Sequence, residues 1–397
     1  MKNALLFSSS FVGHRQVYIF VFVHILQKLD YRIYIAGNFN TKLNSTFYFD
    51  RFNDNNNIFR IDTSEFAGDG VDIKLDEFIA LQNKYNIELT VFTEADSHIS
   101  LFVSQLNAGK KRLKGKIVGI FLRPFYFYYK LAFIDKILYV RYLHKTWKTD
   151  ARLFHEVLNP FFHLLDVSLH LNDFFVSRHK STVWLPDVFQ QYADQLVIEE
   201  NSDQRRWMRK LEEFKENNMN AIMILYFGNP QQRRGYDVLM KIAVDNKACF
   251  IHCGLRNDSK EYDLDIDKLR EELNLQNRLF ETNEYINDPL TIEYFFKAVS
   301  HLILPYRDFT GSSGVMLQAL SYNIPVLVPD FGLMGYRVKK YNLGSTYDNG
   351  SFDTQFKSFL NTPKDFFTKS IVEYMKSQSV QNLNSTLVRA INGEIIQ

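Results

Sequence analysis

A loop of small residues between two apolar segments holds the residue types best suited to binding a phosphate. Residues 301–332 read HLILPYRDFTGSSGVMLQALSYNIPVLVPDFG, which predicts a strand ending at Pro305, a helix beginning near Gly314 and a second strand beginning at Pro325. The loop before the helix contains Gly311, Ser312, Ser313 and Gly314. Its amides can approach a ligand closely, and the free amides of a helix N-terminus attract anions. The serines suit simple helix capping equally well, so both interpretations stay open.

A second candidate loop carries two adjacent arginines. Residues 224–243 read ILYFGNPQQRRGYDVLMKIA, which predicts a strand ending at Phe227 and an amphipathic helix beginning at Gly235. Arg233 and Arg234 lie between them, where arginines are most simply solvated turn charges. Both loops follow strands of the same predicted sheet, which favours a shared role.

Together the two loops resemble the donor-binding segments of GT-B glycosyltransferases, specifically the retaining family 4. In that family two glutamates frame the glycine-rich loop, and here Thr310 and Gln318 occupy their positions. The family's second motif places an arginine and a lysine before the helix, and here Asn229 and Arg234 occupy those positions. Arg233, in the same loop, can compensate for the missing arginine.

The resemblance implies a role for each matching residue. The family's second glutamate binds the ribose hydroxyls, and Gln318 keeps an acceptor oxygen for that contact. The first glutamate contacts the donor sugar, where Thr310 offers only a short hydroxyl. The expected catalytic residues are Arg234 and Thr310. The expected donor-binding residues are Gly13, from the N-terminal glycine loop, with Asn229, Arg233, Arg234, Gly311, Ser312, Ser313, Gly314, Val315 and Gln318.

The N-terminal half is expected to bind the acceptor. Residues 93–100 read TEADSHIS and follow a predicted strand, so Glu94, Asp96 and His98 could form a polar acceptor site. Polar residues in such a loop are commonly just solvated, which is the competing interpretation.

The elements that must position these residues alternate between strand and helix. Apolar runs in the first half are found at residues 4–7, 31–36, 87–92, 117–122, 167–171 and 183–185. A second alternation begins at residue 221 and continues beyond residue 328. Such alternation predicts parallel sheets covered by helices, in which ligands bind beyond the carboxyl ends of the strands.

The predicted fold class is therefore α/β, with two Rossmann-like doubly wound parallel-sheet domains facing across a cleft (GT-B). We expect an N-terminal acceptor domain at residues 1–190, an interdomain linker at 191–220 and a donor domain at 221–375. The linker is expected because its composition is polar and charged. A C-terminal helix at 376–397 is expected to follow and to pack back on the N-terminal domain.

An aromatic and basic stretch at residues 122–148 suits either a membrane surface, with a lipid-linked acceptor, or simple packing of helices on the core. Charged residues interrupt the overlapping apolar stretch at residues 117–143, so it is not expected to span a membrane. The N-terminus lacks the features of a secretory signal. We expect a cytoplasmic protein, with peripheral contact on the inner face of the membrane as an open alternative.

Composition and cysteine placement argue against two other kinds of function, nucleic-acid binding and metal binding. A formal net charge of +2 over 397 residues makes no case for nucleic-acid binding. Cys249 and Cys253 lie in the apolar run ACFIHCG, where alternation places both on one strand face and His252 on the other. We therefore expect buried cysteines and no metal site.

The expected function is transfer of a sugar from a nucleoside-diphosphate sugar to an acceptor hydroxyl. The resemblance implies retention, surface polysaccharide or glycolipid assembly, and no cofactor beyond the nucleotide sugar as co-substrate. A sugar phosphorylase, a nucleotide-sugar epimerase and a degenerate homologue that binds without transfer remain competing hypotheses.

Overall fold

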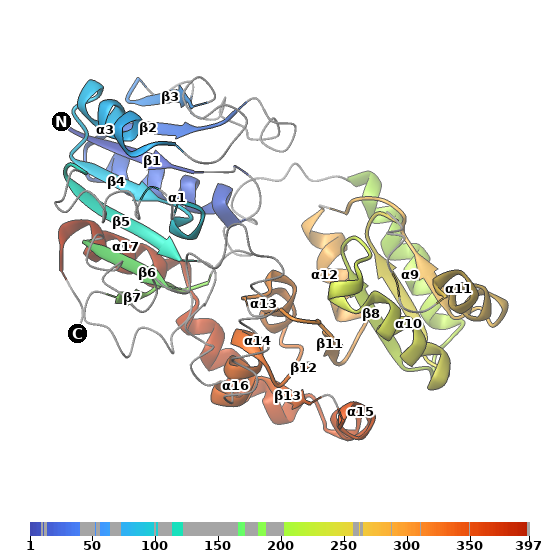
Figure 1. Cartoon of the computed structure of the whole chain (residues 1–397). Coiled ribbons are helices and arrows are strands. Elements are labelled where there is room, and N and C mark those ends of the chain that lie inside the picture. The colour runs from blue at the N-terminus through green and yellow to red at the C-terminus, as the bar shows by residue number, and fades with distance from the viewer. Residues whose placement is uncertain are drawn as a thin grey trace. The chain divides into compact units, whose positions relative to one another are not determined.

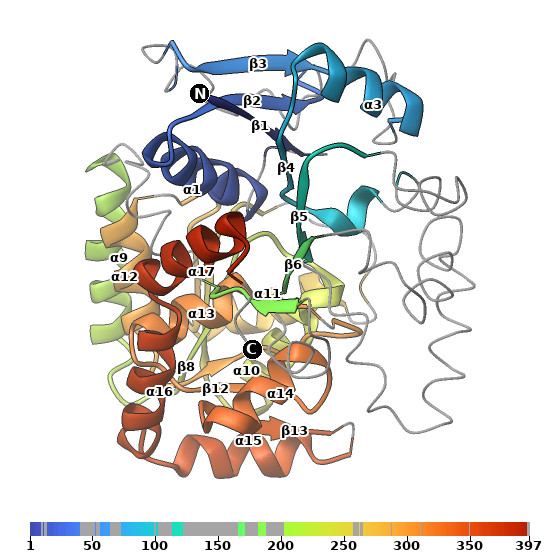
Figure 2. The same cartoon turned by 90° about the vertical axis from the view of Figure 1, so that its left-hand side faces the viewer.

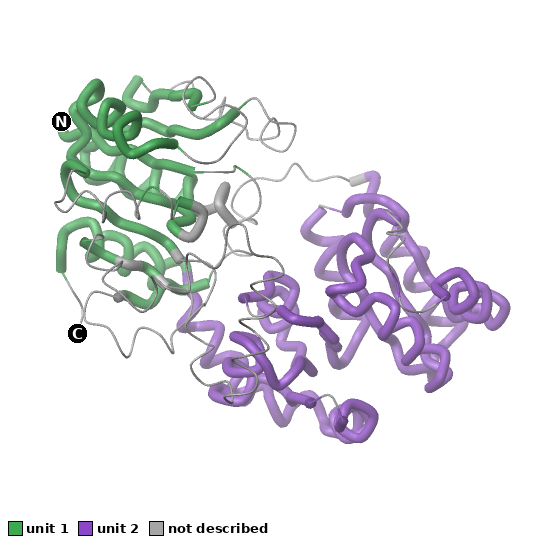
Figure 3. The backbone as a smooth tube through the Cα atoms, in the orientation of Figure 1, with its two compact units in different colours: residues 1–189, 380–397 green, residues 190–379 purple. Residues whose placement is uncertain are grey.

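The structure is a computed structural model that describes residues 1–8, 11, 14–39, 52, 56–63, 73–98, 101, 113–121, 166–170, 182–187, 202–256, 262, 265–286, 288–309, 311–348 and 350–394. The chain divides into two compact units (Figure 3). Unit 1 comprises residues 1–189 and 380–397, and unit 2 comprises residues 190–379. Both units are built from parallel strands and helices, so the predicted α/β class is confirmed (Figure 1).

Unit 1 contains a seven-stranded parallel sheet in the order β3-β2-β1-β4-β5-β6-β7. The strands are β1 (Lys2–Phe7), β2 (Tyr31–Gly37), β3 (Ile58–Asp62), β4 (Leu89–Phe92), β5 (Lys116–Phe121), β6 (Val167–His170) and β7 (Thr182–Trp184). β4 is buried along its whole length, as the inner strand of a parallel sheet must be when helices cover both faces. The order reverses between β1 and β4, as in doubly wound folds.

The described helices of unit 1 include a segment from the far end of the chain. They are α1 (His14–Lys28), α3 (Leu75–Lys84) and α17 (Val380–Asn392), with a 3-10 turn at Ala95–His98. α17 packs against α1 and β7, and Figure 2 shows α1 and α17 side by side. The Lys116 ammonium on β5 donates to the carbonyl of Ile391 at 2.7 Å. The C-terminal helix expected at 376–397 thus begins at Val380 and belongs to unit 1.

Unit 2 contains two three-stranded parallel sheets where one sheet was expected. The first has the order β10-β9-β8 and the second β11-β12-β13. The strands are β8 (Met223–Phe227), β9 (Cys249–Cys253), β10 (Leu279–Glu281), β11 (Leu302–Ile303), β12 (Val326–Pro329) and β13 (Gly344–Tyr347). β11 lies beside β8 without sharing a strand ladder with it. β11 has only two residues and is soon followed by Pro305, which has no N–H to extend a ladder.

Helices complete unit 2. They are α9 (Arg206–Glu216), α10 (Tyr236–Asp245), α11 (Ile266–Leu275), α12 (Pro289–Lys297), α13 (Gly314–Ser321), α14 (Gly332–Tyr341), α15 (Phe352–Asn361) and α16 (Asp365–Ser377). α9 falls inside the interval expected as a linker, yet Leu211 on it is fully buried in the core of unit 2. Its polar composition reflects the exposed face of an amphipathic helix, so residues 206–216 are part of the folded unit.

The strand order of unit 2 places the two candidate loops at the same edge. The chain proceeds from β8 to β9 and β10 on one side, then returns to β11 beside β8 and continues to β12 and β13. The loops after β8 and β11 therefore flank the point where the strand order reverses. In doubly wound sheets this point is where ligands bind.

The segment expected to contact a membrane, residues 122–148, lies outside the described residues. None of the helices in the described ranges has both the length and the apolar composition needed to cross a bilayer.

Candidate functional site

The first loop of the site leads from β8 to α10. Tyr226, near the end of β8, holds the loop through its hydroxyl, which donates to the carbonyl of Asn229 at 2.8 Å and accepts from the amide of Gln231 at 3.1 Å. Burial raises the pKa of Tyr226 well above its ordinary value, while the charge of Arg234 acts in the opposite direction. The hydroxyl therefore stays protonated and can serve as donor and acceptor together.

A glycine allows this loop to meet the second one. Gly235, just before α10, has a φ of 69°, a conformation that L side chains rarely adopt. A Cβ at this position would lie 2.4 Å from the carbonyl oxygen of Pro305. Only a glycine permits this approach, so the segment just after β11 packs directly against the start of α10.

The second loop leads from β11 to α13. Ser313 is the N-cap of α13, and its hydroxyl accepts from the amide of Met316 at 3.2 Å. The Ser312 hydroxyl accepts from Nη1 of Arg337 at 3.0 Å, and Arg337 is buried on α14. Both serine side chains thus have partners within the protein. The first backbone amides of a helix have no intrahelical acceptor, so those of α13 are the groups suited to an anion.

Arg307 joins the two loops. Its backbone amide donates to the carbonyl of Arg233 at 2.8 Å. Its guanidinium donates to Oδ2 of Asp237 at 2.8 Å, and Asp237 is fully buried in the first turn of α10. The Arg233 guanidinium lies 5.1 Å from the centre of the Phe309 ring, within cation–π range. The loops that follow β8 and β11 are therefore in direct contact.

Two arginines on these loops are not neutralised by a carboxylate among the described residues. Asp237 forms an ion pair with Arg307. Neither Arg233 nor Arg234 forms an ion pair with any residue in the part of the chain that the structure describes. Arg233 is exposed and Arg234 is half-buried. The Arg234 guanidinium reaches back over Gly228, where a Cβ would lie 2.7 Å from its Nη1. This arrangement can attract a doubly charged anion such as a diphosphate.

Gln318 lies within α13 with only 5% of its surface exposed. Its Nε2 has no hydrogen-bond partner among the described residues. An unpaired buried amide is costly, and a ligand that supplied an acceptor would remove the cost.

The remaining expected site residues divide into two groups. Gly13 and Thr310 lie outside the described residues. Glu94 and His98 belong to unit 1, where both are 1% exposed, and the ring of His98 packs 4.8 Å from that of Phe7. Asp96 lies in the same 3-10 turn, at Ala95–His98. The interpretation of this loop as simply solvated does not describe Glu94 and His98, because both side chains are buried.

Sequence patterns did not indicate Arg307, Asp237 or Arg337 as parts of the site. Asp237 and Arg307 are far apart in the sequence, so no local spacing connects them. Only their positions along the chain could have indicated a role. Arg307 follows a predicted buried strand, and Asp237 lies in the first turn of a predicted helix.

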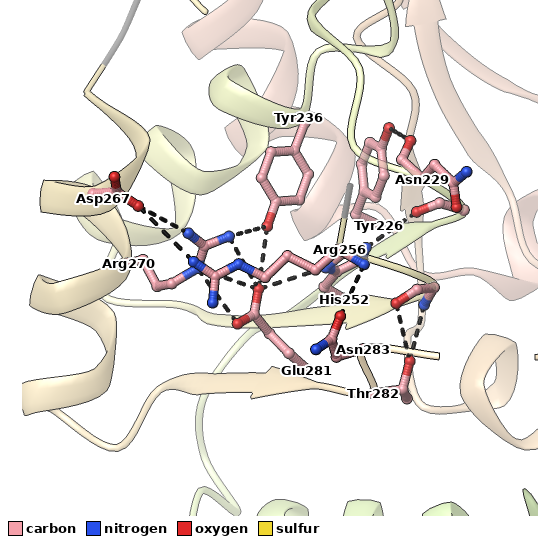
Figure 4. Close-up of polar contacts among 12 residues, drawn as sticks. Tyr226, Asn229, Tyr236, His252, Arg256, Asp267, Arg270, Glu281, Thr282 and Asn283 are labelled. Carbon is pink, nitrogen blue, oxygen red and sulfur yellow. Dashed lines mark hydrogen bonds and ion pairs between the residues drawn. The ribbon is translucent and has the colours of Figure 1, made fainter. Parts of the chain in front are cut away.

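A buried polar network, also unforeseen, lies beside the first loop (Figure 4). His252 on β9 faces the carbonyl of Gly228 through Nε2 at 3.1 Å and Oε1 of Glu281 through Nδ1 at 3.5 Å. Arg270 on α11 contacts the same carboxylate at 3.4 Å. The Tyr236 hydroxyl donates to it at 3.3 Å.

Comparison with known proteins identifies the fold. No family model matches the chain, and no curated protein matches it in sequence. Solved structures match it over nearly its whole length. Sucrose-phosphate synthase from Thermosynechococcus elongatus is 12% identical, with a TM-score of 0.62, and the match covers 99% of this chain and 98% of that one. The lipopolysaccharide outer core galactosyltransferase WaaB is 13% identical, with a TM-score of 0.60 and coverage of 99% and 100%.

HepE from Anabaena was solved with UDP. It is 10% identical, with a TM-score of 0.59 and coverage of 99% and 100%. A further structure of that protein contains UDP-glucose. At these identities the likeness establishes the fold, which is GT-B, with two Rossmann-like units.

Proposed function

We propose that this chain is a glycosyltransferase that moves a sugar from a nucleoside-diphosphate sugar to an acceptor hydroxyl. The observation that carries the proposal is the contact between the loops after β8 and β11, made by the Arg307 amide and the Arg233 carbonyl at 2.8 Å. This contact joins the loop of Arg233 and Arg234, which have no ion-pair partner within the described ranges, to the loop that leads into the helix capped by Ser313. The structural neighbours include a protein solved with UDP and with UDP-glucose, which supports a nucleotide-sugar donor.

In the proposed reaction, Arg233, Arg234 and the first amides of α13 stabilise the departing diphosphate with fixed charge. Thr310 would contact the donor sugar, and Gln318 would pair with the ribose hydroxyls, accepting through Oε1 and donating through Nε2. Asn229 completes the part of the proposed donor site that lies in unit 2. We further propose that no dedicated metal is needed, that the anomeric configuration is retained, and that the acceptor hydroxyl attacks the face from which the diphosphate leaves.

The acceptor is proposed to bind near Glu94, Asp96 and His98 in unit 1. A carbohydrate or lipid-linked acceptor fits assembly of a surface polysaccharide or glycolipid, with the protein in the cytoplasm or bound to the inner face of the membrane. No cofactor and no nucleic acid are required.

Two measurements test the proposal. A thermal-shift screen against nucleotide sugars and free nucleotides should reveal one family of stabilising donors, because a ligand that binds only the folded state raises its stability. Incubation with the labelled donor should then release nucleoside diphosphate in step with acceptor glycosylation. The absence of any shift at millimolar concentration would exclude a nucleotide-sugar donor. An epimerised donor would instead favour an epimerase, and formation of a sugar phosphate from a glycoside and inorganic phosphate would favour a phosphorylase.

A second candidate function is binding without transfer. It is favoured by the replacement of both family glutamates, by Thr310 and Gln318, and by Asn229 at the arginine position. In this case the donor stabilises the protein but is not consumed. Gln318→Glu and Thr310→Glu, made singly and together, test whether these replacements alone suppress transfer.

A further inference from the structure

Arg337 is a buried arginine on α14 that reaches the glycine and serine loop before α13. Only 2% of its surface is exposed. Its Nη1 donates to the hydroxyl of Ser312 at 3.0 Å, across 25 positions of sequence. Burying a guanidinium costs free energy, and hydrogen bonds to protein acceptors offset that cost. Arg337 is therefore tied to the loop by a contact between separate elements, which no local turn or cap provides.

The position of α14 directs this side chain toward the edge of the sheet where the loop lies. α14 begins at Gly332, just after the carboxyl end of β12, and β12 runs parallel to β11. Side chains on a helix lean toward its N-terminus, so Arg337, in the second turn, extends toward that edge. Gly335 keeps the helix close to the strand, because a Cβ on it would lie 2.6 Å from the carbonyl oxygen of Pro329. The backbone that carries Arg337 is thus packed firmly on β12.

The serine that Arg337 contacts directly precedes the N-cap of α13. The N-cap, Ser313, accepts through its hydroxyl from the amide of Met316 at 3.2 Å and donates to the hydroxyl of Tyr306 at 3.4 Å. The Ser313 carbonyl accepts from the amide of Leu317 at 3.1 Å. The contact from Arg337 therefore holds the chain at the point where it enters the helix, and the direction of the first helical amides depends on this point.

We propose that Arg337 is a positioning residue that holds the first turn of α13 in place for a diphosphate, acting through the hydroxyl of Ser312. The inference rests on the proposed function of this loop. An amide binds a phosphate oxygen well only when its N–H points at that oxygen, so a loosened turn binds less tightly even though its amides are all still present. Because one hydrogen bond carries the effect, replacing either of its two residues should have the same consequence.

Arg278 provides a matched control for the loss of a buried arginine. It lies in the same unit, is 7% exposed, and donates through Nη1 to the carbonyls of Ala243 and Ala248 at 2.9 and 3.0 Å. Ala248 comes just before β9, at the amino ends of the parallel strands and therefore away from the two candidate loops. Arg278→Met should destabilise unit 2 without loosening the start of α13.

The first test needs no ligand. Amide hydrogen exchange of Met316 and Leu317, whose acceptors both belong to Ser313, is compared in the wild-type protein, Arg337→Met and Arg278→Met. We expect exchange of these two amides to increase several-fold in Arg337→Met and to stay at the wild-type rate in Arg278→Met. Unchanged exchange in Arg337→Met, or an equal increase in both variants, would overturn the positioning role whether or not a nucleotide binds.

The second test measures affinity for UDP, ADP and GDP by calorimetry, and affinity for the corresponding nucleosides by competition. In Arg337→Met we expect the dissociation constant of the diphosphate to increase about tenfold, near the lower end of the effect of losing a hydrogen bond from a charged group. The dissociation constant of the nucleoside, which has no phosphate, should change less than about twofold. Arg278→Met should change neither by more than about twofold. An equal loss for diphosphate and nucleoside would mean a general structural role and would overturn the inference alone.

A double-mutant cycle tests whether Arg337 acts through Ser312. Ser312→Ala should weaken diphosphate binding about tenfold, and the double variant should also weaken it about tenfold, because both changes remove the same hydrogen bond. A loss of about a hundredfold in the double variant would show independent effects and would overturn the proposed route. A wild-type protein that binds none of the three nucleotides would overturn the proposed function, while the exchange experiment would still decide whether Arg337 positions the turn.

Discussion

At the scale of single residues, the arginines of the candidate site differ in whether they have a carboxylate partner. Arg307 has a buried partner, Asp237, so its charge is used to hold the two loops together. Arg233 and Arg234 lie on the same loops without such a partner among the described residues. Two positive charges held beside a helix N-terminus leave these loops with a net positive charge, and the proposed diphosphate would neutralise it.

Arg234→Ala tests this directly. Removing one charged contact to a phosphate costs about 1.5–3 kcal/mol, so we expect diphosphate affinity to decrease about 10- to 100-fold with little change in the unfolding temperature. Calorimetric titration measures the affinity. Arg209→Ala, which removes an exposed arginine from α9 in the same unit, is the matched control and should bind as the wild-type protein does. Equal affinity in Arg234→Ala would remove this arginine from the site.

Local sequence patterns located the arginines of the first loop and the small residues of the second. They missed the Arg307–Asp237 pair and the Arg337–Ser312 hydrogen bond, because each joins residues from different elements. The sequence showed Thr310 and Gln318 at the two positions where the resemblance predicted glutamates. The sequence did not reveal that Nε2 of Gln318 is buried without a hydrogen-bond partner among the described residues, because this depends on how α13 packs.

At the scale of elements, the close approach of β11 to α10 depends on the backbone of one glycine. Gly235→Ala would place a Cβ 2.4 Å from the Pro305 oxygen and strain a residue at a φ of 69°. We expect a loss of at least about 2 kcal/mol in the free energy of unfolding and a parallel loss of diphosphate affinity. Urea titration and calorimetry measure the two effects.

Gly350→Ala is the control for that substitution, because the nearest atom to its added Cβ is 4.0 Å away. It should leave both quantities near the wild-type values. If Gly235→Ala proved as stable as Gly350→Ala, the two loops would not be packed as closely as the structure places them.

The residue before β11 connects that strand to the end of α15. His301 faces the Thr362 carbonyl through Nε2 and the Ser300 hydroxyl through Nδ1, each at 2.9 Å. Burial lowers the pKa of His301 below its ordinary value of 6.5. Just below pH 6.5 the unfolded chain therefore binds more protons than the folded one, and stability rises with pH in this interval.

His301→Gln should therefore make stability less dependent on pH. We expect the urea midpoint of the wild-type protein to fall as the pH is lowered from about 6.5 to 5, and that of the variant to fall less, because glutamine does not titrate. Parallel curves for the two proteins would show that His301 titrates alike in the folded and unfolded states.

Strands with nearly continuous apolar sequences were predictable from the sequence. Short strands and strands that contain charged residues were not. β1, β2, β8 and β9 match the sequence prediction closely, because each is a nearly continuous apolar run. β3 and β10 were missed, since Ile58–Asp62 alternates with charged residues and Leu279–Glu281 has only three residues. The division of unit 2 into two sheets depends on the shortness of β11, which the sequence does not reveal.

At the scale of the whole molecule, the end of the chain completes the unit in which the chain begins. α17 contributes Leu383, Leu387, Ala390 and Ile391 as buried side chains in unit 1. It packs on α1 and β7 and accepts a hydrogen bond from Lys116 on β5. Burial lowers the pKa of Lys116 below its ordinary value, although the charge of Asp166 acts the other way. Because the buried side chains of α17 form part of the core of unit 1, this core cannot be completed until α17 has been synthesised.

Truncation after Ser379 should destabilise unit 1 selectively. Each buried leucine or isoleucine lost from α17 removes about 1.5–3 kcal/mol of hydrophobic stabilisation. The summed loss is a large part of the free energy of unfolding of an ordinary domain. We expect amide exchange to accelerate in α1, β5 and β7, while β8, β9 and α10 keep their protection and diphosphate still binds to unit 2. Truncation after Gly393, which keeps α17, is the control. Uniform acceleration across both units would show that they unfold as one cooperative body, whereas loss of protection confined to unit 1 would establish that the C-terminal helix serves the unit at the opposite end of the sequence.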